Sequence, residues 1–127
     1  MGFNSFSVGH KFGPYEVLID QNASELYSKA IINRDLENHS PFAIVSTCFG
    51  KLLADVNLED GAIHLNQSIS WEKEINEKEM IYAKPVIDSK NERRNNVFIK
   101  IRVEYCDKSN NKLGESISTI LINLEGE

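Results

Sequence analysis

The spacing of hydrophobic residues changes near the middle of the chain, from helical spacing before it to strict alternation after it. Residues 15–19 begin with an alternating pattern that is typical of a short strand. Asn22, with Glu25 three positions later, forms a capping-box pattern that predicts a helix over residues 23–32. The polar residues 33–40 end this helix. The first part of the chain therefore predicts one strand, one amphipathic helix and a polar break.

A second helix is predicted over residues 41–56, with Ser40 as its N-cap and Pro41 at its first position. Its apolar residues cover more than half of its circumference, so we expect protein to surround it on most sides. Gly50 costs this helix about 1 kcal/mol relative to alanine, which indicates close packing at that point. The apolar residues are Phe42, Ile44, Val45, Cys48, Phe49, Leu52, Leu53 and Val56.

Alternation of apolar and polar residues then predicts four strands, over residues 62–71, 80–88, 97–105 and 116–124. The polar stretches 88–96 and 107–114 are typical of turns between antiparallel neighbours. In the first of these strands, alternation puts Gln67 on the apolar face and His64 on the opposite face. Pro85 cannot donate to a ladder and marks an edge or a bulge.

This order of elements favours an α+β fold in which a curved antiparallel sheet wraps around one long central helix. The whole chain, residues 1–127, is predicted to be a single domain.

Composition narrows the possible functions. The chain is 41% hydrophobic and 26% charged, with a formal net charge of −5. It has no dense block of basic residues, which disfavours binding to a phosphate backbone. Cys48 and Cys106 lack metal-ligand spacing and are expected to be reduced thiols of a cytoplasmic protein. No signal peptide is visible, and no apolar run approaches the ~18 residues of a membrane span.

Three stretches resemble the MaoC-like hydratases and dehydratases, which have the hot-dog fold and act on acyl thioesters. Residues 40–56 resemble the Pro-led central helix of that family, residues 61–87 its Gly-x-x-His-x-x-Gln strand with the following turn and strand, and residues 114–122 its closing Gly-led strand. The likeness is greatest to the N-terminal half of two-part members. It implies a thioester of coenzyme A or of a carrier's pantetheine as substrate and no other cofactor. No metal is expected, because the three histidines, His10, His39 and His64, are too widely spaced for a metal-ligand pattern.

Catalytic members of this family carry the motif Gly-Asp-x-Asn-Pro-x-His, whose Asp and His hold and activate a water molecule. The resemblance makes Asp35 and His39 the candidate pair. They stand four positions apart, one fewer than in the motif, and Arg34 and Pro41 depart from its Gly and Pro positions. The alternative is a polar loop in which both residues help to cap the neighbouring helices.

Candidate substrate-binding residues are His64, Gln67, Arg93 and Arg94. The resemblance places His64 at the His of Gly-x-x-His-x-x-Gln, and its alternative role is that of a hydrogen-bonded structural histidine. Gln67 on an apolar face needs a partner, either across a dimer interface or on a thioester carbonyl. Arg93 and Arg94 suit the phosphates of coenzyme A or a carrier, or else are ordinary solvated charges.

Three functions stay open. The chain is an (R)-specific enoyl-CoA hydratase or 3-hydroxyacyl thioester dehydratase, a non-catalytic subunit of such an enzyme, or a hot-dog thioesterase. The departures in the motif of Asp35 and His39 favour the second. A thioesterase needs a carboxylate on or beside the central helix, where Asp55 stands. We expect a homodimer, or a heterodimer with a second hot-dog chain, because one unit leaves a sheet edge open.

Overall fold

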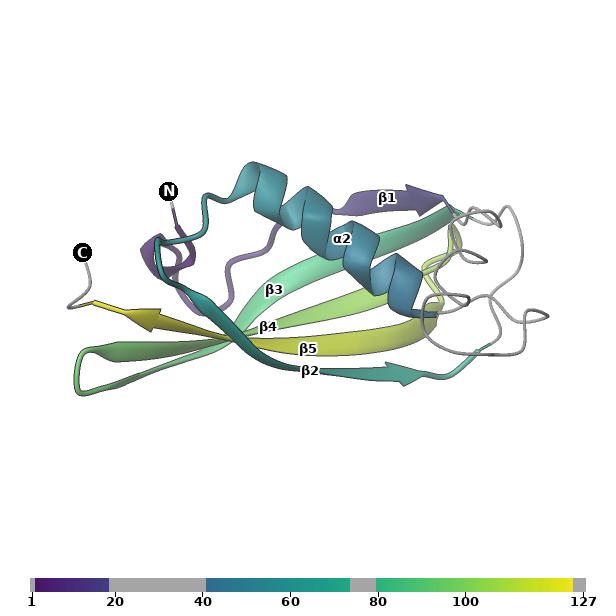
Figure 1. The fold of residues 1–127 in the computed structure, drawn as a ribbon. Coiled ribbons are helices and arrows are strands. Elements are labelled where there is room, and N and C mark those ends of the chain that lie inside the picture. The colour runs from purple at the N-terminus through teal and green to yellow at the C-terminus, as the bar shows by residue number, and fades with distance from the viewer. Residues whose placement is uncertain (1, 19–40, 74–79, 125–127) are drawn as a thin grey trace.

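The computed structural model describes residues 2–18, 41–73 and 80–124, which form one antiparallel sheet with a helix lying across it (Figure 1). The predicted helix over residues 23–32 lies outside the described residues, as does the polar break over residues 33–40 that follows it. The elements in chain order are the 3-10 helix η1 (Phe3–Ser5), β1 (Tyr15–Leu18), α2 (Pro41–Asp55), β2 (Ile63–Trp71), β3 (Met80–Arg93), β4 (Asn96–Cys106) and β5 (Lys112–Asn123).

The sheet has the strand order β1-β3-β4-β5-β2, and every neighbouring pair is antiparallel. β1 and β2 are therefore its two edges. The sheet curves around α2, which covers one of its faces (Figure 1). The predicted α+β arrangement, a curved antiparallel sheet around a central helix, is confirmed. In the described part of the chain, no helix is both long and apolar enough to cross a membrane.

Helix α2 buries one stripe of side chains against the sheet and leaves another side open. Phe42 on the open side is 46% exposed. A Cβ built on Gly50 would have nothing within 4 Å. The expected surrounding of the helix by protein, and the close packing at Gly50, are therefore wrong for the described residues. An apolar pattern shows which positions avoid water, and it does not show what covers them. The buried stripe consists of Ile44, Val45, Cys48 and Leu52.

The inner face of the sheet follows the predicted alternation most closely on β4. Its alternate side chains point to α2 and are almost fully buried, whereas Lys100 and Glu104 are exposed. Adjacent strands contribute further buried aliphatic residues to the same layer. The core is thus a single layer between helix and sheet. Its β4 members are Val97, Ile99, Ile101, Val103 and Tyr105.

The predicted turn over residues 88–96 is mostly strand, because β3 continues to Arg93 and β4 begins at Asn96. The turn itself is Arg94 and Asn95, with φ angles of 49° and 69°. Positive φ at both central residues gives a turn whose twist matches that of the two strands. The hairpin projects beyond α2 (Figure 1), and residues 91–95 at its tip are exposed, so the polar sequence there shows no alternation.

Pro85 lies in β3, which is an inner strand, so the predicted edge position is wrong. A register shift does occur nearby, between Ile87 and Ser89. The ladder between β1 and β3 stops at the pair Tyr15 and Ala83. The missing N–H of Pro85 therefore falls just beyond the end of that ladder, where it leaves no hydrogen bond unmade.

The N-terminal arm, residues 2–14, is fastened to the rest of the chain by two charged side chains. The Glu59 carboxylate accepts hydrogen bonds from the backbone N–H groups of Phe3 and Asn4, both at 2.9 Å. The Lys90 ammonium donates to the carbonyl oxygens of Asn4 and Phe6 at 2.9 and 3.0 Å. The ring of Phe3 is fully buried in the core. The arm is thus part of the packed structure.

Candidate functional site

A groove between helix α2 and edge strand β2 brings two predicted site residues together. Its cavity volume is about 360 Å³. Phe49 and Leu53 supply apolar surface from the helix, and His64 and Gln67 supply polar groups from the strand. We call this cavity the α2–β2 groove. Its lining is Ser46, Phe49, Gly50, Leu53, His64 and Gln67.

A bulge in β2 puts His64 on the helix side. His64 pairs with Ile120 of β5, and Asn66 pairs with Thr119, so Leu65 is an extra residue between them. One extra residue exchanges the faces of the side chains on either side of it. The prediction that His64 and Gln67 lie on opposite faces is therefore wrong, because strict alternation does not hold across Leu65.

The imidazole of His64 lies flat against the ring of Phe49. The two ring centroids are 5.3 Å apart and the ring planes differ by 12°. His64 remains exposed to solvent on its other side. This stacking orients the imidazole, whose ring nitrogens can donate or accept hydrogen bonds, at the mouth of an apolar groove.

Gln67 has the partner that its position on the helix side requires. Its Nε2 donates to Ser118 Oγ on β5 at 3.1 Å, in a partly buried position. The partner therefore lies in the same sheet, and the two alternatives raised by the sequence stay predictions. An amide NH₂ carries two hydrogens, so Ser118 takes one and the amide is held at a fixed angle to the groove.

The region under the helix holds a small buried polar cluster. Tyr105 Oη lies 2.8 Å from Ser116 Oγ. Burial raises the pKa of the Cys48 thiol to about 12, and only weaker effects of Tyr105 and Lys51 lower it. Cys48 is therefore a neutral thiol at physiological pH. A neutral, buried thiol is a poor nucleophile.

Asp55 ends α2 on a different side of the helix from the groove. Its Oδ2 accepts a hydrogen bond from Tyr15 Oη at 2.6 Å, which joins the helix to β1. Burial and the neighbouring Asp55 carboxylate raise the pKa of Tyr15. Asp55 does not line the groove. The carboxylate that a thioesterase requires is thus tied to a tyrosine away from His64 and Gln67.

Arg93 and Arg94 lie at the exposed turn between β3 and β4. Figure 1 shows this turn at the opposite end of the molecule from Pro41, where α2 begins. Neither arginine lines the α2–β2 groove, and their role toward phosphates stays a prediction. Asp35 and His39 lie outside the described residues, so their role stays a prediction too.

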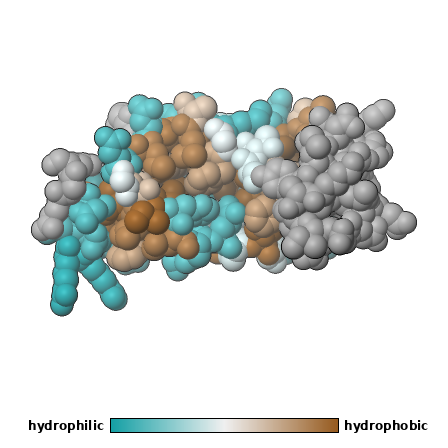
Figure 2. Space-filling model, viewed as in Figure 1, coloured by the Kyte–Doolittle hydropathy of each residue, from teal (hydrophilic) through white to brown (hydrophobic). Residues whose placement is uncertain are grey.

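Several features of the groove were not anticipated from the sequence. Ser46 and Gly50 are four positions apart and therefore lie on one face of α2. Two small residues in that spacing were a signal for a hollow on the helix surface. Hydrophobic residues gather over α2 on this side of the molecule (Figure 2), and polar residues interrupt them. In the described ranges, no group of three His, Cys, Asp or Glu side chains could hold a metal ion.

Solved structures share this architecture over almost their whole length. A (3R)-hydroxyacyl-ACP dehydratase complex from Mycobacterium tuberculosis matches with a TM-score of 0.72 and 13% identity, over 91% of this chain and 96% of that chain. A MaoC-like dehydratase from Rhodospirillum rubrum matches with a TM-score of 0.70 and 10% identity, over 98% and 97%. An (R)-hydratase from A. caviae matches with a TM-score of 0.70 and 14% identity, over 91% and 96%.

The chain has the hot-dog fold. The resemblance to MaoC-like proteins noted in three stretches of the sequence is confirmed at the level of the fold. Identities of 10% and 14% are too low to transfer an activity. No family model matches the sequence, and no curated protein matches it.

Proposed function

We propose that this hot-dog chain binds acyl thioesters, with the acyl chain lying in the α2–β2 groove. The observation that supports this most strongly is an open apolar groove with two polar side chains at one wall. Phe49 and Leu53 offer apolar surface to a hydrocarbon chain, and Gly50 leaves space for it. Concave, mostly apolar sites with few polar groups are the usual form of small-molecule sites.

His64 and Gln67 suit the polar end of such a ligand. A thioester carbonyl accepts hydrogen bonds, and both side chains can donate them. The stacking of His64 on Phe49 and the bond from Gln67 to Ser118 hold the two donors in place. We propose that they orient the thioester, which belongs to coenzyme A or to the pantetheine of a carrier protein.

We further propose that the chain takes part in the (R)-specific hydration of enoyl thioesters, or in the reverse dehydration. Its main role in this reaction would be that of a subunit that binds the substrate. Hydration needs one group to move a proton and a second to hold the water. Of the described groove residues, His64 carries the one imidazole, the side chain used most often as a general acid or base. The second group would have to come from Asp35 and His39, whose spacing departs from the family motif. A catalytic hot-dog partner would supply it instead.

Edge strand β2 supports pairing with a second chain. It is 9 residues long, and its sequence, IHLNQSISW, has neither a charged residue nor a proline. Soluble proteins normally protect exposed edges with such residues. The opposite edge, β1, has 4 residues and includes the exposed Glu16. We propose that β2 pairs with a second hot-dog chain, identical or different, which also covers Ile63 and Leu65.

Thioester hydrolysis is the remaining function of hot-dog proteins raised by the sequence. The carboxylate expected for it, Asp55, bonds to Tyr15 and lies outside the groove. No observation in the described residues favours this function.

Binding calorimetry tests the proposal directly, with octanoyl-CoA and free coenzyme A as the two ligands. Burial of hydrocarbon stabilises by about 0.8 kcal/mol per CH₂, so partial burial of the octanoyl chain should tighten binding at least tenfold. Equal dissociation constants for the two ligands would contradict an acyl site. A product assay by chromatography in the same samples shows whether the bound thioester is hydrolysed.

A further inference from the structure

We infer that this chain has a second binding site, for a small organic anion that carries an apolar group. The site is a cavity of about 420 Å³ on the face of the sheet that points away from α2. It is separate from the α2–β2 groove, because Lys84, Val86, Arg102 and Glu104 line it from the outer face of β3 and β4. We call it the outer pocket. The N-terminal arm completes its lining with Lys11, Phe12, Gly13 and Pro14.

The sequence explains why a cavity exists here. The ladder between β1 and β3 ends at Tyr15 and Ala83, and the arm rejoins β3 where Phe12 N–H donates to the Pro85 carbonyl at 2.9 Å. Between these points, Gly13 takes a φ of 70° that side chains rarely adopt. Pro85 accepts this one hydrogen bond and has no N–H to donate a second one to the arm. The arm is therefore fastened on both sides of a gap.

The charges around the outer pocket are mostly positive, although the whole chain has a net charge of −5. Lys11, Lys84 and Arg102 line the pocket together with one acidic residue, Glu104, which is the cross-strand partner of Lys84. The three cations come from three different segments of the chain. A concave site with an excess of one charge attracts ligands of the opposite charge.

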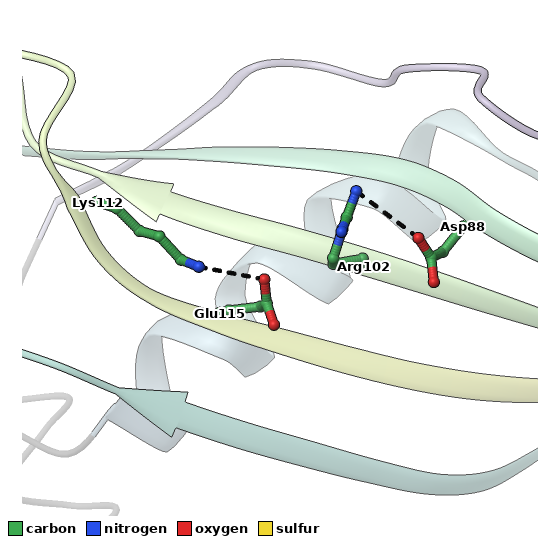
Figure 3. Close-up of polar contacts among 4 residues, drawn as sticks. All are labelled: Asp88, Arg102, Lys112 and Glu115. Atoms are coloured by element: carbon green, nitrogen blue, oxygen red, sulfur yellow. Dashed lines mark hydrogen bonds and ion pairs between the residues drawn. The ribbon is translucent and has the colours of Figure 1, made fainter.

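Two of these cations are oriented by neighbouring groups. The Lys84 ammonium donates to the side-chain oxygen of Asn110. Arg102 lies 3.7 Å from Asp88, and its side chain remains 43% exposed. Figure 3 shows this pair in front of the sheet with the helix behind it, on the face that the outer pocket occupies. At this distance and exposure the Asp88 contact is weak, so Arg102 can also face an anion.

The rest of the lining is apolar and sets the class of ligand. Phe12, Pro14, Pro85 and Val86 form the apolar part of the wall. The volume falls within the range of about 300–1,000 Å³ that is usual for small-molecule sites. Cations beside an aromatic ring and two prolines fit a carboxylate or phosphate monoester that is attached to a ring or a short hydrocarbon chain.

The test is a titration of the ¹⁵N-labelled full chain with phenyl phosphate, followed by NMR. Amide shifts should saturate with one dissociation constant, and the largest should fall on Lys11, Phe12, Lys84 and Arg102. Inorganic phosphate and benzyl alcohol each lack one half of the ligand, so each should bind at least about tenfold more weakly. Phenylacetate in place of phenyl phosphate distinguishes a carboxylate site from a phosphate site. Shifts that fail to saturate, or that centre on His64 and Gln67, would overturn the inference.

Paired variants separate a defined site from general attraction of anions. The double variant Lys11→Gln/Lys84→Gln should raise the dissociation constant of phenyl phosphate about tenfold. Lys51→Gln/Lys73→Gln removes the same charge from exposed positions on α2 and after edge strand β2, outside the pocket, and should change the dissociation constant less than about twofold. Equal effects of the two double variants would mean that only the overall charge of the chain attracts the anion, which would contradict a defined site. Thermal unfolding of both variants verifies that the fold is retained.

Discussion

The imidazole of His64 on β2 lies parallel to the ring of Phe49 on α2, with 5.3 Å between the ring centroids. This relationship depends on the extra residue Leu65, which turns His64 toward the helix. It joins an edge strand to the open side of the central helix. The α2–β2 groove exists because these two elements meet without a further layer over them in the described residues.

Leu52 should be among the costliest positions of the helix to truncate. Its side chain is fully buried between α2 and the sheet. Leu52→Ala removes packing and leaves a cavity, so it should lower the free energy of unfolding by about 2–5 kcal/mol. Urea unfolding measures this change. Lys51 is the exposed neighbour of Leu52, and Lys51→Ala should change the free energy of unfolding by no more than about 0.5 kcal/mol. A loss below about 1 kcal/mol at Leu52 would place the helix outside the core.

Alkaline pH should destabilise the fold through Cys48. Burial raises the pKa of its thiol from 9.0 to about 12. Between these values the unfolded chain loses the proton and the folded chain keeps it, so stability is full below pH 9 and falls as the pH rises. At about pH 10.5 the Cys48 contribution to the loss should be about 2 kcal/mol.

The variant Cys48→Ala isolates this effect. Its free energy of unfolding should fall less steeply above pH 9 than that of the wild type, because the tyrosines and lysines titrate in both proteins. Urea unfolding at several pH values gives the two slopes. Identical slopes would mean that water reaches the thiol in the folded chain.

The alternating pattern of β4 was sufficient to predict its buried face, since each of its inward positions is aliphatic or aromatic. The face of the sheet on which His64 lies could not be predicted, because no sequence pattern in the strand IHLNQSISW indicates the bulge at Leu65. The β3–β4 hairpin was predicted, but the length of its strands was underestimated for a related reason. Residues 91–95 at its tip are exposed beyond α2, so neither face needs apolar residues there and the alternating pattern is absent.

Gly50 illustrates a different limit. A glycine within an apolar helix suggested a close neighbour, whereas the structure shows open space beside it. Close packing and open space are both compatible with a residue that has no side chain, and only the three-dimensional structure distinguishes them. The roles of Asp35 and His39 rest on the sequence alone, since they lie outside the described residues.

Pairing through β2 should be sensitive to charge on that edge. Leu65 on β2 is 44% exposed, and Leu18 on the opposite edge is 58% exposed. Leu65→Lys would place an ammonium in the proposed interface and should convert a dimer into a monomer. Leu18→Lys makes the same chemical change at the other edge and should leave the dimer intact.

Sedimentation velocity at micromolar concentration measures both outcomes, with a heterodimer partner added if the chain alone is monomeric. Loss of the dimer in the Leu18→Lys variant, and not in the Leu65→Lys variant, would assign the interface to β1. A wild-type monomer that captures no second hot-dog chain would contradict pairing altogether.

The candidate dyad should contribute little to activity in the isolated chain. Moving His39 by one residue relative to the family motif displaces its side chain by up to about 3.5 Å. A misplacement of about 1 Å can already cost a hundredfold in rate. Asp35→Asn and His39→Ala should therefore leave a slow hydration rate nearly unchanged. Hydration of crotonyl-CoA and longer enoyl-CoA thioesters, followed by absorbance, measures it. A fast wild type that loses more than about a hundredfold in either variant would establish the chain as an enzyme.

The most direct test of an acyl site in the α2–β2 groove is the affinity for octanoyl-CoA after Gly50 is changed to leucine. The new side chain would occupy space that is open beside the helix. Thr47 is exposed on the same helix and does not line the groove, so Thr47→Leu is the matched control. We predict that Gly50→Leu weakens the binding of octanoyl-CoA at least tenfold and leaves the weaker binding of free coenzyme A unchanged. Thr47→Leu should change the affinity for neither ligand. Equal octanoyl-CoA affinities for Gly50→Leu, Thr47→Leu and the wild type would contradict the proposed site.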